Sequence, residues 1–374
     1  MKSLLLYAFL LCSVVAQATH LRGGQIRVVS VNGLNVTVEL RVITDTGSEI
    51  KVGEGNFDFG DGTTVITETK ENTRIDSRLG IGLVVYTLEH TYASVGTYRL
   101  SYTEPNLTGG ILNITNSIET RFYIESQVVL TGPGQSPTIN FPTDPIFVCP
   151  TGREYVFSTA AIDDSSPNDF YYTYELPTPS SNVKGYKLPE NLSINKENGL
   201  IKWDTKFNGQ QVVGLIWILV RVNKFSKTKG FMASVWRAIQ ITVEDSTSKI
   251  DMTNSVTEDN NKLLVTEGKE KKVKVILSEV NSNDSLYLDV YFNKAIRSNI
   301  SINKRDSIAG NMKFKIAMIT LKTTSNIVSE QPYPVTVSGR SKYRVDFTFL
   351  YNTKEPTPDP IVTGVLDQEY DAVY

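Results

Sequence analysis

Apolar and polar residues alternate along most of this chain, and this period-two pattern limits its fold more than any other feature. Residues 25–31 and 35–43 are clear cases. Alternation places one face of a β-strand on a core and the other in water. The 3.6-residue period of an amphipathic helix is almost absent. The sequence therefore predicts an all-β fold.

Turn signals divide these strands into blocks of sandwich size. Asn32-Gly33 is a strong hairpin signal between the first two strands, and 84–92 and 97–103 are predicted to form a second pair across 93–96. Turn-rich 132–137 and polar 245–249 separate the blocks. The pattern predicts tandem Ig-like β-sandwiches, each of about 100 residues. The predicted organisation is a signal peptide at 1–18, sandwiches at 19–131, 138–245 and 250–352, and a disordered tail at 353–374.

The N-terminus has the pattern of a secretory signal. Lys2 precedes an apolar stretch at 4–15, and Ala16-Gln17-Ala18 places small residues where a signal peptidase cuts. We predict cleavage after Ala18. A retained anchor and a lipoprotein signal at Cys12 are the alternatives, but the stretch is shorter than the roughly 20 residues a span needs. The later apolar run 212–220 is also too short, so no transmembrane span is predicted in the mature chain.

Charge and cysteine content exclude several classes. The net charge of −2, with both signs mixed along the chain, gives no electrostatic footprint for nucleic acid. After cleavage only Cys149 remains, so no internal disulfide is expected. We predict that Cys149 is a small buried apolar residue.

Few residues could carry catalysis. The chain has two histidines, His20 and His90, and lacks both a metal-spaced His/Cys cluster and a Gly-rich phosphate loop. Asp58 and Asp61 could be read as a glycosidase pair, but a tight hairpin explains them at lower cost. The protein is predicted not to be an enzyme and to need no cofactor, calcium being the one candidate.

Two segments of the first block share a recognisable pattern. Phe57-Asp58-Phe59-Gly60-Asp61-Gly62 is followed by His90-Thr91-Tyr92 and then by Gly96-Thr97-Tyr98. This order and spacing resemble the polycystic-kidney-disease (PKD) repeat, an Ig-like sandwich, although Phe57 stands where tryptophan is commoner. The resemblance implies a structural role for the motif residues, which are Phe57, Asp58, Phe59, Gly60, Asp61, Gly62, His90, Tyr92, Gly96 and Tyr98.

The second block has a recognisable pattern in segments 161–164, 172–176, 188–194 and 198–203. These segments resemble the cadherin-like Ig-type repeats of bacterial surface proteins. In that family the acidic cluster that begins in the first of these segments can hold calcium, which needs six to eight oxygen ligands. The candidate ligands here are Asp163, Asp164, Asn168 and Asp169. The family's glycine is missing, so an Asx-rich turn is the alternative.

These features suggest a function that is not catalytic. The start 19–26 is similar to that of large adhesion-associated surface proteins of the Bacteroidetes. The prediction is an exported adhesion or spacer module, extracellular, on the outer-membrane surface or periplasmic, with a surface protein or glycan as partner. One alternative is a carbohydrate-binding accessory protein using Tyr171, Tyr172 and Tyr174. The other is a secreted hydrolase with an unrecognised carboxylate site.

Overall fold

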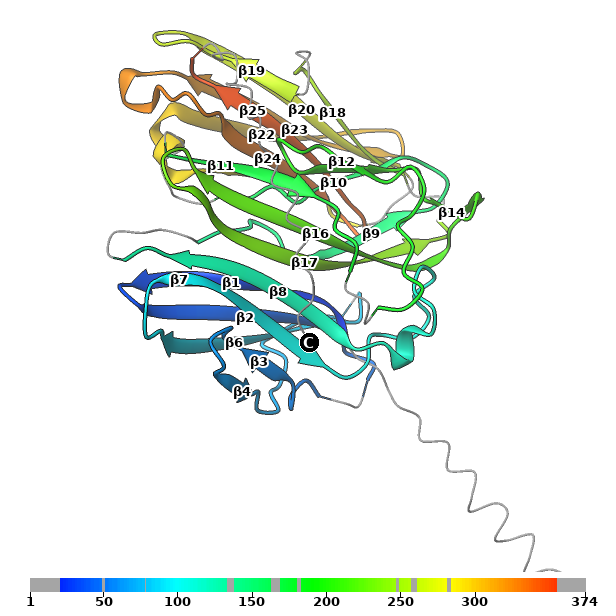
Figure 1. Ribbon diagram of the computed structural model, residues 1–374. Helices are drawn as coiled ribbons and strands as arrows, with labels where there is room; N and C mark the ends of the chain where they lie inside the picture. Colours follow the sequence, from blue (N-terminus) through cyan, green and yellow to red (C-terminus); the bar gives the residue numbers. More distant parts are fainter. Residues whose placement is uncertain are drawn as a thin grey trace, which may run out of the picture.

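The chain is all-β and consists of Ig-like β-sandwiches stacked one on another (Figure 1). The computed structural model describes residues 21–48, 51–77, 79–132, 138–162, 169–179, 183–246, 249–256, 261–280 and 284–354. The predicted signal peptide lies outside the described residues, as does the predicted tail beyond Lys354. Among the described residues, no helix is long and apolar enough to cross a membrane.

The first sandwich faces two four-stranded groups across one core. Their orders are β4-β3-β7-β8 and β1-β2-β6-β5. Alternate apolar side chains from both groups meet in a cluster that includes Leu40, Phe57 and Tyr102. The strands are β1 (Leu21–Asn32), β2 (Asn35–Asp45), β3 (Asn56–Asp58), β4 (Thr64–Ile66), β5 (Arg74–Asp76), β6 (Ile81–Thr91), β7 (Gly96–Glu104) and β8 (Phe122–Leu130), with a short 3-10 helix η1 (Ser117–Glu119).

The predicted β1–β2 hairpin is confirmed, with Asn32 opposite Asn35 and Gly33 at a φ of 63°. The predicted pairing of 84–92 with 97–103 is wrong. β6 pairs with β2 and β5, whereas β7 pairs with β3 and β8. The connection between β6 and β7 crosses from one four-stranded group to the other, because both strands direct their apolar residues into the same core from opposite sides.

The second sandwich packs a long sheet on a short one. The long sheet contains β9 (Ile146–Pro150), β11 (Phe170–Glu175), β16 (Gly214–Ser226) and β17 (Gly230–Glu244), and the short sheet has the order β10-β13-β12. Trp203, Phe157 and Ile218 lie in the core between them. The remaining strands are β10 (Tyr155–Ser158), β12 (Ser193–Ile194), β13 (Leu200–Trp203), β14 (Lys206–Phe207) and β15 (Gln210–Gln211).

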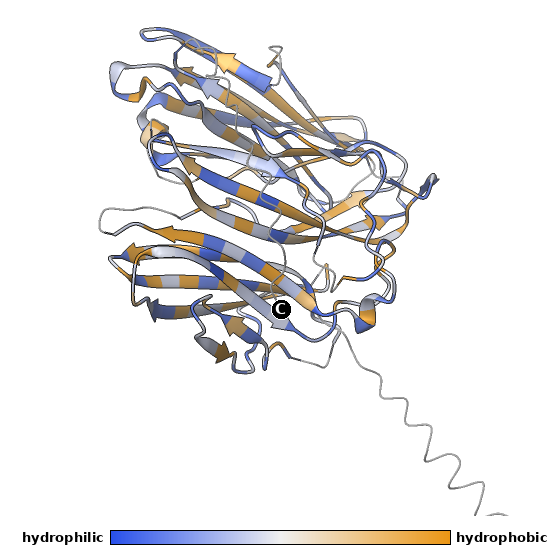
Figure 2. Ribbon diagram, in the orientation of Figure 1, coloured by the Kyte–Doolittle hydropathy of each residue, from blue (hydrophilic) through white to orange (hydrophobic). Residues whose placement is uncertain are grey.

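The third sandwich consists of two four-stranded sheets, β18-β20-β23-β22 and β19-β25-β24-β21. Tyr343, which precedes the last strand, and Phe347 and Tyr351 within it lie in the core between the two sheets. The strands are β18 (Lys249–Asn254), β19 (Lys262–Leu264), β20 (Glu270–Val280), β21 (Tyr287–Phe292), β22 (Ile300–Ala309), β23 (Met312–Lys322), β24 (Tyr333–Arg340) and β25 (Arg344–Asn352), with short 3-10 helices η3 (Lys294–Asn299) and η4 (Ser325–Ile327). The alternation appears in Figure 2 as bands of opposite hydropathy across the strands.

Strand β17 joins the first two sandwiches. One of its edges pairs with β16 along its whole length. Its other edge pairs in turn with β8, β1 and β9. The two sandwiches therefore share a twelve-stranded sheet and are more than neighbours on a linker. The domain boundaries drawn from the sequence stay a prediction.

Candidate functional site

The motif that resembles a PKD repeat forms a tight turn between β3 and β4. The Asp58 carboxylate accepts a hydrogen bond from the Gly60 amide at 2.7 Å, and the Asp61 carboxylate accepts one from the Thr63 amide at 3.0 Å. Gly60 has a φ of +80°, and a Cβ there would lie 2.4 Å from the Arg99 carbonyl oxygen. Only glycine fits this position without strain. Both carboxylates thus close the turn.

An aromatic stack extends from this turn across the sandwich. The His90 ring lies parallel to Phe59, with ring centroids 4.4 Å apart, and Tyr92 meets His90 edge-on at 4.6 Å. Tyr92 stacks on Tyr98 at 3.8 Å and donates its hydroxyl to the Phe59 carbonyl at 2.8 Å. Burial raises the pKa of the Tyr92 hydroxyl. The stack fixes the turn to the strands that follow it.

Tyr98 also ties its own strand to the preceding turn. Its hydroxyl donates to the Ser94 carbonyl at 2.7 Å. Tyr98 lies near the start of β7, two residues before the buried Leu100. A tyrosine that bonds back to the backbone at this corner is a recurring feature of Ig-type sandwiches. The structure thus brings the predicted motif residues into one cluster, and their structural role remains our interpretation.

The Asp61–His90 pair makes the stability of this cluster depend on pH. Nε2 of His90 lies 2.7 Å from Oδ2 of Asp61. Burial opposes the charged carboxylate, but hydrogen bonds from His90 and Thr63 outweigh it, and the pKa of Asp61 lies below its usual 3.8. A carboxyl whose pKa is lower in the folded chain stabilises the fold above its unfolded pKa, and that contribution is lost as pH falls through the folded pKa.

We therefore expect Asp61→Asn to lower the urea midpoint of unfolding at neutral pH. The difference from the parent should shrink once the pH falls below the folded pKa of Asp61, because the parent carboxyl is then also neutral. Glu89 is exposed on the same strand as His90 and provides a matched control, Glu89→Gln. An Asp61→Asn midpoint that differs from the parent by the same amount at every pH would contradict the assignment.

The candidate metal ligands are only partly described. Asp163, Asp164 and Asn168 lie outside the described residues. The carbonyl oxygen of Asp169 accepts a hydrogen bond from the Lys227 amide at 3.0 Å. Within the described ranges, no group of three or more His, Cys, Asp or Glu residues could hold a metal ion. The calcium site stays a prediction. If a chelator leaves the melting temperature of the protein unchanged, the chain does not bind calcium at this site.

The three predicted tyrosines of β11 divide between the two faces of the sheet. Tyr174 is buried, and its hydroxyl accepts a hydrogen bond from the Ala161 amide at 2.9 Å. Tyr172 packs against the same core. Tyr171 points to the other face and stacks on Phe225 with ring centroids 5.2 Å apart, and Phe231 meets Phe225 edge-on at 5.8 Å. These three half-buried rings form an aromatic patch on the outer face.

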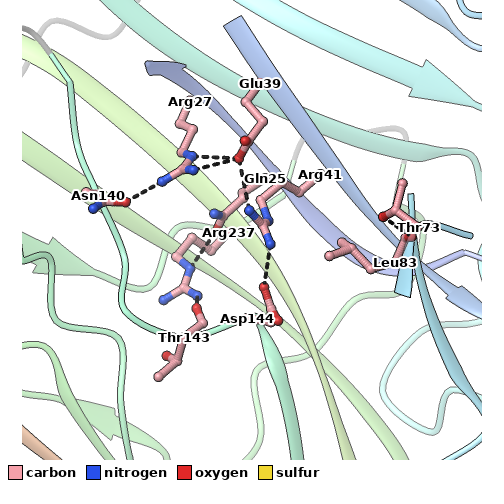
Figure 3. A network of polar contacts seen from close by, with 10 residues as sticks. All are labelled: Gln25, Arg27, Glu39, Arg41, Thr73, Leu83, Asn140, Thr143, Asp144 and Arg237. Atoms are coloured by element: carbon pink, nitrogen blue, oxygen red, sulfur yellow. Dashed lines mark hydrogen bonds and ion pairs between the residues drawn. The ribbon is translucent and has the colours of Figure 1, made fainter. Parts of the chain in front are cut away.

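The joint between the first two sandwiches contains a polar network that no local sequence signal predicts (Figure 3). Arg237 of β17 is fully buried and donates to the Gln25 side chain at 2.9 Å and to the Thr143 carbonyl at 2.6 Å. The Phe141 ring covers its guanidinium, with the ring centroid 4.1 Å from Cζ. The side chain therefore binds groups from both sandwiches.

A network of charged side chains lies next to the buried Arg237. Glu39 accepts from Arg27 at 2.8 Å and from Arg41 at 3.1 Å. Arg41 also donates to the Asp144 carboxylate at 3.1 Å, and Arg27 donates to Asn140. Burial opposes the charge on Glu39, but the two arginines lower its pKa. The network links strands of the first sandwich to the segment that opens the second.

A second buried joint connects the second and third sandwiches. Arg344 and Asp346 form a bidentate ion pair at 2.7 and 2.9 Å, and the Asp346 side chain is fully buried. Asp346 also accepts from the Ser158 amide at 2.9 Å. Thr348 bonds to the Ser158 hydroxyl at 2.6 Å. The polar face of β25 is thus covered by β10 instead of water.

Cys149 lies in the core of the second sandwich as a free, buried thiol. Burial raises the pKa of this thiol, so the reactive thiolate is disfavoured. Its position agrees with the predicted role as a small apolar residue.

Comparison with known proteins adds little. No protein-family model matches the chain, and no curated protein matches it significantly. Solved structures with some likeness include the Ig1-2 module of Drosophila receptor protein tyrosine phosphatase DLAR, 10% identical over 58% of this chain and 98% of that one, with a TM-score of 0.22.

A Dpr2 Ig1-Ig2 structure in complex with DIP-Theta Ig1-Ig3 is 8% identical over 85% of this chain and 94% of that one, with a TM-score of 0.20. A chicken TCR structure is 10% identical over 58% of this chain and 100% of that one, with a TM-score of 0.19. TM-scores this low carry no argument, so the fold assignment rests on the strands and cores described above.

Proposed function

We propose that the protein is a non-catalytic, exported surface protein that serves as an adhesion or spacer module. The observation that supports this best is the pair of buried joints. β17 continues the sheet from one sandwich into the next, and Asp346 is buried between the second and third. Domains joined by a plain linker move relative to one another by default. Buried, hydrogen-bonded joints instead hold the three sandwiches in one orientation, as a spacer requires.

The same proposal includes the type of the first sandwich and the place to which the protein is exported. The motif turn and aromatic stack support a PKD-like first sandwich, and the start of the chain resembles Bacteroidetes surface proteins. Export would follow cleavage after Ala18 and place the protein outside the cell or on its outer-membrane surface. N-terminal sequencing of exported material should read Thr19 first, and another first residue would remove this cleavage site.

A binding screen separates adhesion from spacing. Purified chain 19–374 would be assayed against cells, extracellular matrix and a glycan array, with an unrelated tandem sandwich protein as the control. Binding above the control supports adhesion. No binding, together with a single fixed shape in small-angle scattering, supports a spacer. Several distinct interdomain arrangements would count against the rigid joints and hence against the spacer.

The aromatic patch of Tyr171, Phe225 and Phe231 favours carbohydrate binding as a second candidate function. Half-exposed tyrosine and phenylalanine rings give a flat apolar surface of the kind that suits a sugar ring. If the glycan array gives a signal, Tyr171→Ala should abolish it, whereas Tyr287→Ala, on an exposed ring of the third sandwich, should not. Equal signals from both variants would exclude the patch.

A further inference from the structure

The outer face of the sheet β18-β20-β23-β22 is apolar over part of its two middle strands. Buried residues such as Val275 of β20 and Ile319 of β23 mark the core face of this sheet. The alternate residues of the two strands point the other way. Six of these are apolar and half-buried, namely Ile276, Val280, Met312, Phe314, Ile316 and Met318. None of the six belongs to a hydrophobic cluster formed by the described residues.

Strand pairing joins these six residues into one continuous surface, which we call the outer apolar patch. Val280 lies opposite Met312, and Ile276 lies opposite Ile316. Phe314 stands between Met312 and Ile316 on the same face of β23. The apolar side chains therefore touch along and across the strands instead of being scattered singly over the face.

A sheet face that meets water has a different composition in this protein. The outward residues of β7 in the first sandwich are all polar: Thr97, Arg99, Ser101 and Thr103. An antiparallel sheet with one solvated side normally has such a face. The outer apolar patch departs from this pattern, so it suits contact with another surface better than contact with water.

The other side of the same hairpin is charged. Lys315 of β23 stands on the core-facing side and pairs with Asp306 of β22 at 2.9 Å. Lys313, on the same side, donates to the Asp284 carbonyl at 2.8 Å. At this end of the sheet the charged residues therefore face inward and the apolar residues face outward. The apolar residues lose the free energy of burial unless another surface covers them.

The other sandwiches of the described chain leave this patch uncovered. The third sandwich lies at one end of the stack (Figure 1). Its other sheet, which contains β25, faces the second sandwich, because Asp346 and Thr348 of β25 bond to Ser158 of β10. The outer apolar patch lies on the opposite sheet and points away from the second sandwich. A partner molecule can therefore reach it.

A second copy of the chain matches the patch in both hydropathy and charge. Two sheets can pack face to face with their strands nearly aligned. A two-fold axis parallel to the strands, midway between β20 and β23, sets each outward residue of β20 against its β23 pairing partner from the other copy. Ile276 then meets Ile316, and Glu270 meets Lys322. The cations of the face meet no other cation.

The face is also large enough for a dimer. Four strands about 4.8 Å apart and roughly ten residues long present a flat area of about 600 Å², and side chains enlarge the accessible surface. A stable interface takes about 800 Å² from each partner. A two-fold axis at right angles to the strands would fit less well, because it would set Lys274 against Ile276 and Glu270 against Val280.

We propose that the protein forms a two-fold dimer in which the outer apolar patches of two copies pack face to face. The dimer joins two stacks through their third sandwiches. It covers the apolar residues that one chain leaves half exposed, and it needs no change in the described strands.

Sedimentation velocity of the full chain 19–374 over a range of concentrations tests this proposal. The parent should pass from monomer to dimer as the concentration rises. Ile276→Lys should raise the dissociation constant of the dimer about thirtyfold or more, because it places an unpaired charge at the centre of the contact. Ile66→Lys is the matched control, since Ile66 is 61% exposed on β4 of the first sandwich, and it should leave the dissociation constant unchanged.

Phe314→Ser removes an aromatic ring without adding a charge and should also weaken the dimer, by about tenfold or more. Circular dichroism should give the parent's β spectrum for both variants of the patch. A parent that stays monomeric at every concentration, or a dimer that both variants leave intact, would overturn the proposal. If the monomeric parent bound phosphatidylglycerol vesicles and Phe314→Ser did not, the patch would serve a membrane instead of a second copy.

Discussion

Asp346→Ala should lower the free energy of unfolding by about 3–5 kcal/mol, because it leaves the Arg344 guanidinium buried without its counter-charge. Asp346 makes two hydrogen bonds to Arg344 and one to the Ser158 amide, all within a joint that excludes water. Burial disfavours the charged guanidinium, and Asp346 raises the pKa of Arg344, so removing Asp346 takes away the interaction that offsets the cost of burying this charge. The amide of Ser158 also loses its acceptor.

Urea unfolding of the variant and the parent measures this cost. Asp289→Ala is the matched control in the same sandwich, since Asp289 forms only partly exposed ion pairs with Lys304 at 3.7 Å and Arg340 at 3.5 Å. Exposed pairs contribute about 0–1 kcal/mol. If the two variants lose the same amount, the Arg344–Asp346 pair is not an anchor of the joint. Small-angle scattering at low urea should also show the third sandwich released first in Asp346→Ala.

Features that depend on residues close together in the chain, such as strands and tight turns, were predicted well from the sequence. Alternation predicted the strands, and in β25 the alternate residues Phe347, Phe349 and Tyr351 lie in the core. The Asn32-Gly33 turn closes the first hairpin because glycine accepts the positive φ there. The motif from Phe57 to Gly62 lies beside His90, which stacks on Phe59 and bonds to Asp61. Period and turn chemistry are local properties, so a single sequence carries them.

Long-range contacts could not be predicted in this way. The sequence makes 84–92 and 97–103 look like a hairpin, although they belong to the two four-stranded groups that face each other in the first sandwich. Alternation likewise marks Arg344 and Asp346 as a solvent face, because it cannot show that another sandwich covers it. Gln25 and Arg237 are 212 residues apart in the chain. Which polar residues meet in a joint depends on how whole sandwiches pack.

Arg237→Ala should also lower the free energy of unfolding by about 3–5 kcal/mol, by opening a cavity and leaving buried acceptors unpaired. The Gln25 side chain and the Thr143 carbonyl would both lose their donor. The Phe141 ring, which lies against the guanidinium, would lose its packing. Burial lowers the pKa of Arg237 to about 9, so the group remains charged at neutral pH.

Arg237→Met separates the parts of this effect. Methionine fills most of the space and carries no charge, so the remaining cost is the unpaired acceptors, about 1–3 kcal/mol. The methionine variant also removes a buried charge, and this offsets part of the loss, because burying a charge is costly. Arg305→Ala, on the exposed edge of β22, is the matched control and should change stability little. Urea unfolding should therefore rank the variants, from most to least destabilised, as Ala, Met and the Arg305 control. If Arg237→Met were as damaging as Arg237→Ala, the charge-specific hydrogen bonds, and not the packing, would hold the first two sandwiches together.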